Sequence, residues 1–300
     1  MHVIPTYPES IPLELEHREE IQPYLLSHRH GISEYSMASL YPFTKKRNYT
    51  VSTYNNEQGT KEYLFIGNQQ NGEKQEKFAM IPGGFPGSKI MDQLTNEVNE
   101  INTISKESLS KWQSSLEIYF PTYRIEEDRN NADYVYDKKS LIDLVGQSLH
   151  KKLVHAQKFM KEHPERILLP SHVAPKKDMI KILHEWAQNK SSVEDHESTL
   201  LAIENQEALN LKGYVLYTKD IPIAFSLGEE DHSRFIIHIE KALFQYKGVY
   251  QYINRAFASE LGDNIVEINR EQDLGIDGLR QAKMTYEPSY LLMKYKIRIG

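Results

Sequence analysis

The fold is decided by residues 238–254, HIEKALFQYKGVYQYIN. The apolar residues that lead into this stretch predict a strand over residues 234–239. A loop containing Gly248 follows, and Tyr252 and Phe257 then mark the buried side of a helix predicted over residues 249–261. The stretch is therefore a strand, loop and helix unit, in which a glycine stands directly before the helix.

An antiparallel hairpin is predicted before this unit. Two apolar runs, residues 213–218 and 221–227, flank Lys219-Asp220, a break that has room only for a tight turn. The other elements predicted in this half are helices over residues 141–160, 177–188 and 198–210, a strand over 265–268, a helix over 278–284 and a strand over 290–298. This order does not fit a doubly wound nucleotide fold, which requires regular alternation of strands and helices.

A mixture of strands and helices is also predicted for the first half of the chain. Its predicted elements are a hairpin over residues 49–54 and 63–67, a strand over 77–81, helices over 89–104 and 106–113, and a strand over 116–120. Residues 124–133 are polar and lack apolar periodicity, so we expect a domain boundary there. Two domains are predicted, over residues 1–130 and 131–300.

Composition restricts the class of protein. With 300 residues, 39% hydrophobic and 26% charged, the chain is expected to fold into two globular domains. It has no cysteine, which excludes disulfides, thiolate metal sites and a thioester intermediate on the protein. An acidic, proline-containing start is unlike a secretory signal, and no apolar stretch approaches the roughly 20 residues of a membrane-spanning helix. We therefore expect a cytoplasmic location.

The formal net charge of −6 disfavours general nucleic-acid binding, because phosphate contacts depend on concentrated Lys and Arg. Charge is nevertheless uneven along the chain. The segment from Lys151 to His184 holds eight lysines and arginines and three acidic residues. It is either a solvated helical face or a docking patch for RNA or acidic lipid.

Three runs of residues together resemble the transferase domain of the phosphatidylglycerol lysyltransferase C-terminal family. They are Asp133-Tyr134-Val135-Tyr136-Asp137 with Leu144, Gly146 and His150-Lys151-Lys152; His238 to Ala242 with Gly248, Tyr250, Gln251, Ile253 and Asn254; and Asn269 to Gly275 with Gly278-Leu279-Arg280, Ala282-Lys283, Tyr286, Pro288 and Lys294-Tyr295. The family usually has an arginine where this chain has Leu153.

The resemblance implies an α+β (mixed α/β) fold of two tandem GNAT-like, that is acetyltransferase-like, domains. Each would be a mixed, mostly antiparallel sheet flanked by helices. It also implies a relation to enzymes that move an aminoacyl group from charged tRNA onto a lipid head group or a small-molecule amine. The leading hypothesis is therefore an aminoacyltransferase with an aminoacyl-tRNA donor, an amine or hydroxyl acceptor and no cofactor; the oligomeric state stays open.

Glu240 and Asp273 are the candidate general bases. An amine that attacks an ester must lose a proton, and a partly buried carboxylate can be tuned to accept it. His238 should share a strand face with Glu240 and can orient it, although a strand histidine is more often a satisfied core residue. Structural roles remain open for both carboxylates: Glu240 can pair with Lys241 or Arg270, and Asp273 can cap the Gly275 turn or bond Arg280.

Arg280 and Lys283 are the candidate cations. They are three residues apart on one predicted helical face, so both can reach one phosphate or a developing oxyanion. The alternative is a solvated face. Arg270, Lys151 and Lys152 are expected to contribute to the same anion-binding set.

The loop from Gln245 to Gly248 supports an alternative, an acyl-CoA-dependent N-acyltransferase. It connects a strand to the start of a helix, where free backbone N–H groups favour an anion. Gln245 and Gly248 fit the coenzyme A loop of an acetyltransferase, but Tyr250 stands where a small residue belongs. A plain helix cap, or a non-catalytic binding protein that retains the fold, is also compatible with this loop.

Two further motifs are assigned no chemistry. The histidines show no recognised metal spacing, so no metal is predicted. Residues 83–89 contain Pro86 and lack the order of a phosphate-binding loop, so they are interpreted as a turn.

Overall fold

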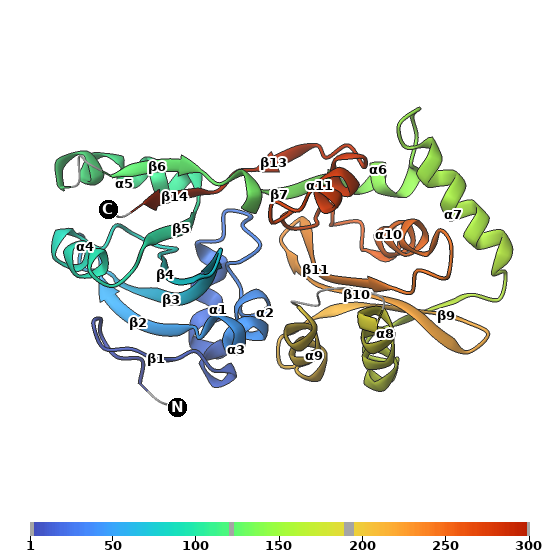
Figure 1. The fold of residues 1–300 in the computed structure, drawn as a ribbon, viewed down its shortest axis with the longest axis horizontal. Helices are drawn as coiled ribbons and strands as arrows, with labels where there is room; N and C mark the ends of the chain where they lie inside the picture. The colour runs from blue at the N-terminus through green and yellow to red at the C-terminus, as the bar shows by residue number, and fades with distance from the viewer. Residues whose placement is uncertain (1–2, 120–122, 189–194, 299–300) are drawn as a thin grey trace. The chain divides into compact units, whose positions relative to one another are not determined.

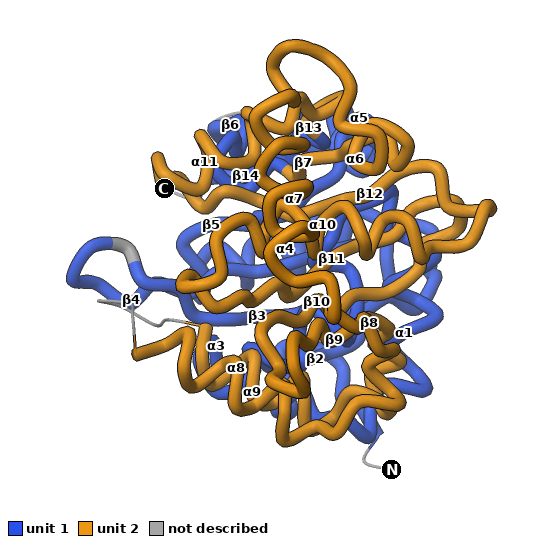
Figure 2. Tube along the Cα trace, turned by 90° about the vertical axis from the view of Figure 1, so that its right-hand side faces the viewer, with its two compact units in different colours: residues 1–132, 292–300 blue, residues 133–291 orange. Residues whose placement is uncertain are grey.

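The computed structural model describes residues 3–119, 123–188 and 195–298 (Figure 1). The chain divides into two compact units, which Figure 2 colours separately. Unit 1 consists of residues 1–132 and 292–300, and unit 2 of residues 133–291. The last residues of the chain therefore belong with the first half.

Unit 1 contains one mixed sheet. Its elements are β1 (Ile11–Pro12), η1 (Leu15–His17), α1 (Arg18–Ser27), α2 (Met37–Leu40), η2 (Tyr41–Phe43), α3 (Thr44–Arg47), β2 (Thr50–Asn55), β3 (Lys61–Asn71), β4 (Lys74–Met80), α4 (Ser88–Thr95), β5 (Glu100–Ile104), α5 (Lys106–Tyr119), β6 (Arg124–Glu127), η3 (Arg129–Asn131) and β14 (Tyr295–Arg298). The strand order is β1-β2-β3-β4-β5-β14-β6, with β4 and β5 parallel and the other neighbours antiparallel.

Unit 2 contains the second sheet. Its elements are β7 (Asp133–Asp137), α6 (Lys138–Asp143), α7 (His150–Glu162), β8 (Ile167–Pro170), α8 (Lys176–Gln188), α9 (His196–Glu204), β9 (Lys212–Thr218), β10 (Ile221–Asp231), β11 (Arg234–Ala242), α10 (Val249–Glu260), β12 (Glu267–Asn269), α11 (Asp277–Met284) and β13 (Tyr290–Leu292). The strand order is β13-β7-β12-β11-β10-β9-β8, and β11 and β12 are parallel.

The two sheets repeat one arrangement. In each, three sequential strands form an antiparallel meander, a helix follows, and the next strand pairs in parallel with the last strand of the meander. The members are β2, β3, β4, α4 and β5 in unit 1, and β9, β10, β11, α10 and β12 in unit 2. The predicted mixed, mostly antiparallel sheets with flanking helices are confirmed.

Local pattern explains the parts of unit 2 that were predicted well. The turn residues Lys219 and Asp220 both have positive φ, at 49° and 63°, which is the twist that a two-residue hairpin requires. Helix α10 begins after Gly248 at φ +86° and buries Val249, Ile253 and Phe257 against the sheet. Helices α7 and α10 lie on one face of this sheet, and α8 and α9 on the other (Figure 1).

Several predicted elements were wrong. The helix predicted over residues 89–104 ends at Thr95, and Glu100–Ile104 is strand β5. The strand predicted over 116–120 is the end of helix α5 up to Tyr119, and residue 120 lies outside the described range. The helix over 141–160 is two helices, because Leu144 adopts φ 50° and ends α6. Strand β8 was not predicted.

The strand predicted over 290–298 is two strands in different sheets. Strand β13 lies at the edge of the second sheet, whereas β14 lies between β5 and β6 of the first. Ile297 is fully buried in the core of unit 1, and Lys294, also fully buried, donates to Glu34. The C-terminal strand was therefore assigned to the wrong half of the chain.

Candidate active site

The parallel pair β11 and β12 brings the predicted site residues together in unit 2. Ile236 pairs with Asn269, the last residue of β12, so β11 continues for six residues alongside the chain that leaves β12. This places residues 270–273 next to His238 and Glu240 of β11. The site is formed by strand ends and a loop.

Glu240 and Arg270 form a mostly buried ion pair. Nη2 of Arg270 lies 3.0 Å from Oε1 of Glu240, and their side chains are 15% and 11% exposed. The guanidinium also lies 5.1 Å from the ring centre of Tyr286 and 5.9 Å from that of Tyr136. Oε2 of Glu240 is buried and has no hydrogen-bond partner among the residues that the structure describes. Oε1 of this carboxylate is therefore paired with Arg270, whereas Oε2 is available to a bound group.

His238 lies between two carboxylates. Its Nδ1 is 2.6 Å from Oε1 of Glu271, and its Nε2 is 3.0 Å from Oε1 of Glu229. Burial alone lowers the pKa of the imidazole, but the hydrogen bonds to both carboxylates outweigh this and raise the pKa of His238 to about 9. His238 is therefore a charged histidine at neutral pH, bonded to Glu229 and Glu271.

Asp273 is surrounded by donors. Its fully buried carboxylate accepts hydrogen bonds from the Tyr134 hydroxyl at 2.6 Å, from Nε and Nη2 of Arg280 at 2.9 Å, and from the Gly275 backbone N–H at 2.8 Å. These bonds occupy the lone pairs that a general base would use. The geometry matches both structural roles considered for Asp273.

Lys283 stabilises the loop that follows β12. Its ammonium donates to the backbone carbonyls of Arg270, Glu271 and Gln272, which matches the three donors of a charged amine. Burial, together with the charge of Arg270, lowers the pKa of Lys283 to about 8. Arg280 and Lys283 thus have separate partners inside the fold, Asp273 and the 270–272 carbonyls.

Lys152 and Lys151 have different surroundings. Lys152 donates to the Thr285 hydroxyl at 2.8 Å, and its Nζ lies 4.2 Å from the ring centre of Tyr286. Burial, followed by the charge of Arg270, lowers the pKa of Lys152. Lys151 is exposed. Lys152 therefore joins the Arg270 cluster.

The loop before α10 lines a hollow of about 340 Å³. Its walls are Val154, His155, Lys158, Lys247, Gly248 and Gln251. Gly248 is required here, because a Cβ atom on it would lie 2.3 Å from the carbonyl oxygen of His155. Gln245 is exposed and does not line this hollow. The hollow combines a helix N-terminus with two lysines, an arrangement that favours an anion.

Tyr250 holds the end of strand β11. Its hydroxyl accepts a hydrogen bond from the Ala242 backbone N–H at 3.3 Å and one from the indole of Trp186 at 3.1 Å. The ring of Trp186 in turn lies 3.7 Å from the ammonium of Lys241. The residue that departs from the coenzyme A pattern is therefore part of a packed network.

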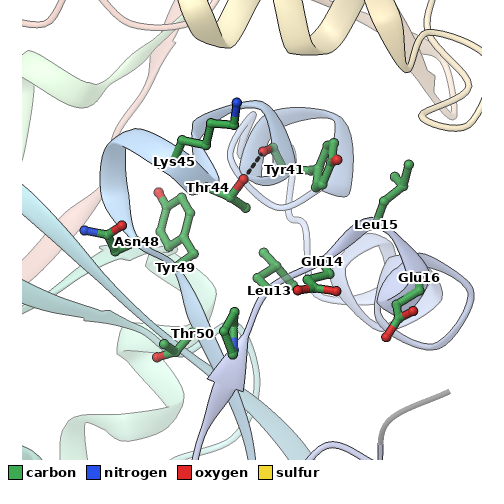
Figure 3. Close-up of a pocket in the computed structure, with 11 residues that line it drawn as sticks. Leu13, Glu14, Leu15, Glu16, Tyr41, Thr44, Lys45, Asn48, Tyr49 and Thr50 are labelled. Carbon is green, nitrogen blue, oxygen red and sulfur yellow. Dashed lines mark hydrogen bonds between the residues drawn. The ribbon is translucent and has the colours of Figure 1, made fainter.

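A larger hollow, of about 630 Å³, lies in unit 1 (Figure 3). One wall carries Glu14 and Glu16, and the other carries Thr44, Lys45 and Asn48. Inside it, the Thr44 hydroxyl donates to the Tyr41 carbonyl at 2.8 Å (Figure 3). Sequence reasoning did not select any of these residues, and they give no recognisable catalytic set.

Across the described parts of the chain, no group of three or more His, Asp or Glu side chains could hold a metal ion. Nor does any helix within those parts have the length and apolar character needed to cross a bilayer.

Sequence reasoning gave no role to several polar residues of this site. They are Glu229, Tyr134, Tyr136 and Tyr286, which bond or contact the predicted residues, and Ser226 and Asn254, which are buried without partners within the described chain. The sequence did contain a signal for Ser226 and Asn254. Each is a polar residue inside an otherwise buried apolar pattern.

Comparison with known proteins gives the family. Residues 27–298 match the family described as phosphatidylglycerol lysyltransferase, C-terminal. A conserved protein of unknown function from Bacteroides thetaiotaomicron has a similar structure, with a TM-score of 0.78, 24% identity, and coverage of 97% of this chain and 99% of that one.

Two further relatives are more distant. The C-terminal domain of a putative lysylphosphatidylglycerol synthetase from Agrobacterium fabrum aligns with a TM-score of 0.57 and 10% identity, over 92% of this chain and 91% of that one. An uncharacterized protein of Mycoplasmoides gallisepticum is 23% identical over 175 residues, which is 57% of each chain. The match thus spans little more than half the length of that curated relative. With the repeated meander, these likenesses show a fold of two units that share one arrangement of strands and helices.

Proposed function

Because this chain belongs to the phosphatidylglycerol lysyltransferase C-terminal family, we propose that it transfers an aminoacyl group from aminoacyl-tRNA to an amine or hydroxyl of a lipid head group or small molecule. The observation that carries the proposal is Glu240. It is a mostly buried carboxylate beside Arg270, and its buried Oε2 has no hydrogen-bond partner among the described residues.

The chemistry needs one base and an oriented acceptor. The acceptor nitrogen or oxygen attacks the carbonyl carbon of the aminoacyl ester, and its proton passes to Oε2 of Glu240. The ester C–O bond then breaks as this proton passes from Glu240 to the tRNA oxygen, which leaves as a hydroxyl. Arg270 fixes the carboxylate through Oε1. A positioned base of this kind contributes about 10²–10⁴-fold to the rate. Asp273, whose carboxylate is already bonded by Tyr134, Arg280 and Gly275, supports the loop in this scheme.

As the acceptor attacks, negative charge develops on the carbonyl oxygen of the aminoacyl ester, and a cation near Glu240 would stabilise it. Lys152 suits this role better than Arg280 or Lys283, because its Nζ lies on the Tyr286 ring beside Arg270 and, within the described chain, makes one hydrogen bond, to Thr285. Arg280 and Lys283 instead hold Asp273 and the 270–272 carbonyls. We assign them to the support of the loop.

The basic segment 151–184 gives limited support to tRNA binding. Its exposed lysines are on α7 (Lys151, Lys158 and Lys161) and on α8 (Lys176, Lys177 and Lys181). These helices lie on opposite faces of the sheet of unit 2 (Figure 1). A single tRNA contact would therefore use the α7 lysines or the α8 lysines.

The test is discharge of aminoacyl-tRNA by the purified protein in the presence of a mixture of amine and hydroxyl acceptors. The Glu240→Gln variant should lose about 10²-fold or more of the transfer rate, and Glu260→Gln, an exposed glutamate on α10, should keep it. If the protein neither retards aminoacyl-tRNA in a gel at low salt nor discharges it, the proposed function is wrong.

A second candidate, acyl-CoA-dependent N-acyl transfer, is favoured by the hollow at the start of α10. Lys158, Lys247 and the first backbone N–H groups of the helix can receive a pyrophosphate there. Calorimetry with acetyl-CoA tests it, and the Lys158→Ala/Lys247→Ala variant should weaken binding at least tenfold. Absence of heat at millimolar acetyl-CoA would remove this candidate.

A further inference from the structure

Ser226 and Glu240 face the same side of the sheet. They are direct partners in the antiparallel pairing of β10 and β11. Two residues further along, Ala224 pairs with Ala242, and both alanines pack in the cluster that includes Val249 and Ile253 of α10. Because side chains two residues apart share a face, Ser226 and Glu240 also point toward α10.

Asn254 of α10 lies at the level of this pair. Helix α10 runs back along β11: Tyr250 bonds the Ala242 N–H, and Phe257 lies 5.1 Å from Phe235 between ring centres. Asn254 follows Ile253, which packs in the same cluster as Ala242, and lies about one turn before Phe257. This places Asn254 between the levels of Ala242 and Phe235, which is where Glu240 lies.

These three side chains leave four buried polar atoms without partners in the described chain. They are Oγ of Ser226, Oε2 of Glu240, and Nδ2 and Oδ1 of Asn254. Ser226 is fully buried, and Asn254 is 1% exposed. Buried polar atoms are almost always hydrogen-bonded, because leaving one unpaired is unfavourable. Four such atoms on neighbouring positions of β10, β11 and α10 indicate a group that the chain itself does not supply.

We propose that Ser226, Asn254 and Glu240 form the subsite that receives the attacking hydroxyl or amine of the acceptor. The set offers donors, from the serine hydroxyl and the asparagine amide, and acceptors, from the asparagine carbonyl and the carboxylate. It therefore fits a neutral group that both accepts and donates a hydrogen bond. A hydroxyl or an uncharged amine is such a group.

This inference rests on the proposed function and adds the position of the nucleophile. The acceptor X–H bond breaks as the X–C bond to the aminoacyl carbonyl forms, and the proton moves to Oε2 of Glu240. It is then available to the departing tRNA oxygen. Asn254 and Ser226 contact the acceptor and orient its lone pair toward the carbonyl carbon.

The binding arm of the test does not require transfer. The side-chain amide signals of Asn254 are assigned by NMR from their loss in Asn254→Asp, and the protein is titrated with ethylamine and, separately, with glycerol. A saturable shift of these signals by either probe supports the subsite and distinguishes an amine from a hydroxyl acceptor. No shift with either probe at 100 mM overturns it and leaves water as the occupant.

The kinetic arm uses Asn254→Leu and Ser226→Ala. Each should raise the KM for the acceptor at least tenfold while the KM for aminoacyl-tRNA stays unchanged, and Asn254→Leu should raise the midpoint of thermal unfolding. Ser259→Ala, an exposed serine on the same helix, is the matched control. Equal loss for both substrates would overturn the subsite. If the wild type transfers nothing, the proposed function fails, and the NMR titration alone decides the subsite.

Discussion

Arg270 donates to Oε1 of Glu240 at 3.0 Å, and this pair is the buried ionic contact around which the candidate active site is organised. The arginine comes directly after β12, and the glutamate comes from the neighbouring parallel strand. Because both side chains are mostly buried, water solvates neither charge well, and each charge is stabilised by the other.

Replacing Arg270 with methionine should destabilise unit 2 by about 3–5 kcal/mol, because it leaves Glu240 as an unpaired buried charge. Denaturant unfolding measures the loss. The double variant Arg270→Met/Glu240→Gln should recover most of it, because no buried charge remains. A loss under about 1 kcal/mol for the single variant would mean that the pair behaves as a solvated surface ion pair.

His238 should make stability fall as pH rises from 6.5 to 8. Its pKa is about 9 in the folded chain, above the ordinary value of 6.5, so the folded state keeps a proton that the unfolded state releases. The stability from this group is complete below 6.5 and is lost as pH rises through 9. Over this interval the loss approaches about 2 kcal/mol.

The comparison is wild type against His238→Gln, with the free energy of unfolding measured at each pH. The difference between the two proteins should shrink across this interval. Lys283 acts in the opposite direction, since its lowered pKa of about 8 makes stability rise between 8 and 10.5. Measurements are therefore confined to pH 6.5–8. Parallel pH profiles would show that Glu229 and Glu271 do not hold the proton on His238.

The parts of the fold that sequence predicted are governed by local pattern. The break at Lys219-Asp220 is so short that it fixes the hairpin and its register, and Gly248 marks the start of α10. Strand β5 and strand β14 were missed for the opposite reason. Residues 100–104 become a strand by pairing with β4, and β14 pairs with strands more than 160 residues earlier, which no local window contains.

The sequence predicted which residues belong to the site, but it did not predict all of the contacts between them. The pairs Glu240 with Arg270 and Asp273 with Arg280 were considered from sequence, and the structure contains both. The two partners of His238 were not. Reaching Glu229 depends on the irregular register between Leu227 and Gly228, which shifts β10 against β11. A bulge of this kind leaves no sequence signal in an apolar strand.

Gly248→Ala should destabilise unit 2 by more than about 2 kcal/mol. The residue has φ +86°, which an alanine adopts only with strain, and the new Cβ would lie 2.3 Å from the His155 carbonyl oxygen. Gly278→Ala is the matched control, because a Cβ there meets nothing within 4 Å and its φ is not in the left-handed region. That variant should be neutral or stabilised by about 0.5 kcal/mol. Equal effects in thermal unfolding would contradict the predicted constraint at α10.

The C-terminal strand β14 should be needed by unit 1 and dispensable for unit 2. Ile297 is fully buried in the core of unit 1, and β14 pairs with both β5 and β6. A chain that ends at Met293 keeps β13 and loses β14. Its β5 amides should exchange hydrogen much faster than in the wild type, whereas those of β9 to β11 should keep their protection.

A point variant tests the same dependence with the chain intact. Ile297→Ala removes buried methyl groups and should destabilise unit 1 by about 2–4 kcal/mol. Ile125→Ala, on the neighbouring strand β6 and 45% exposed, is the control and should change stability by less than about 0.5 kcal/mol. Faster exchange in β9 to β11 than in β5 would mean that β14 supports unit 2 instead. Unchanged exchange in β5 would show that the first sheet is stable without its C-terminal strand.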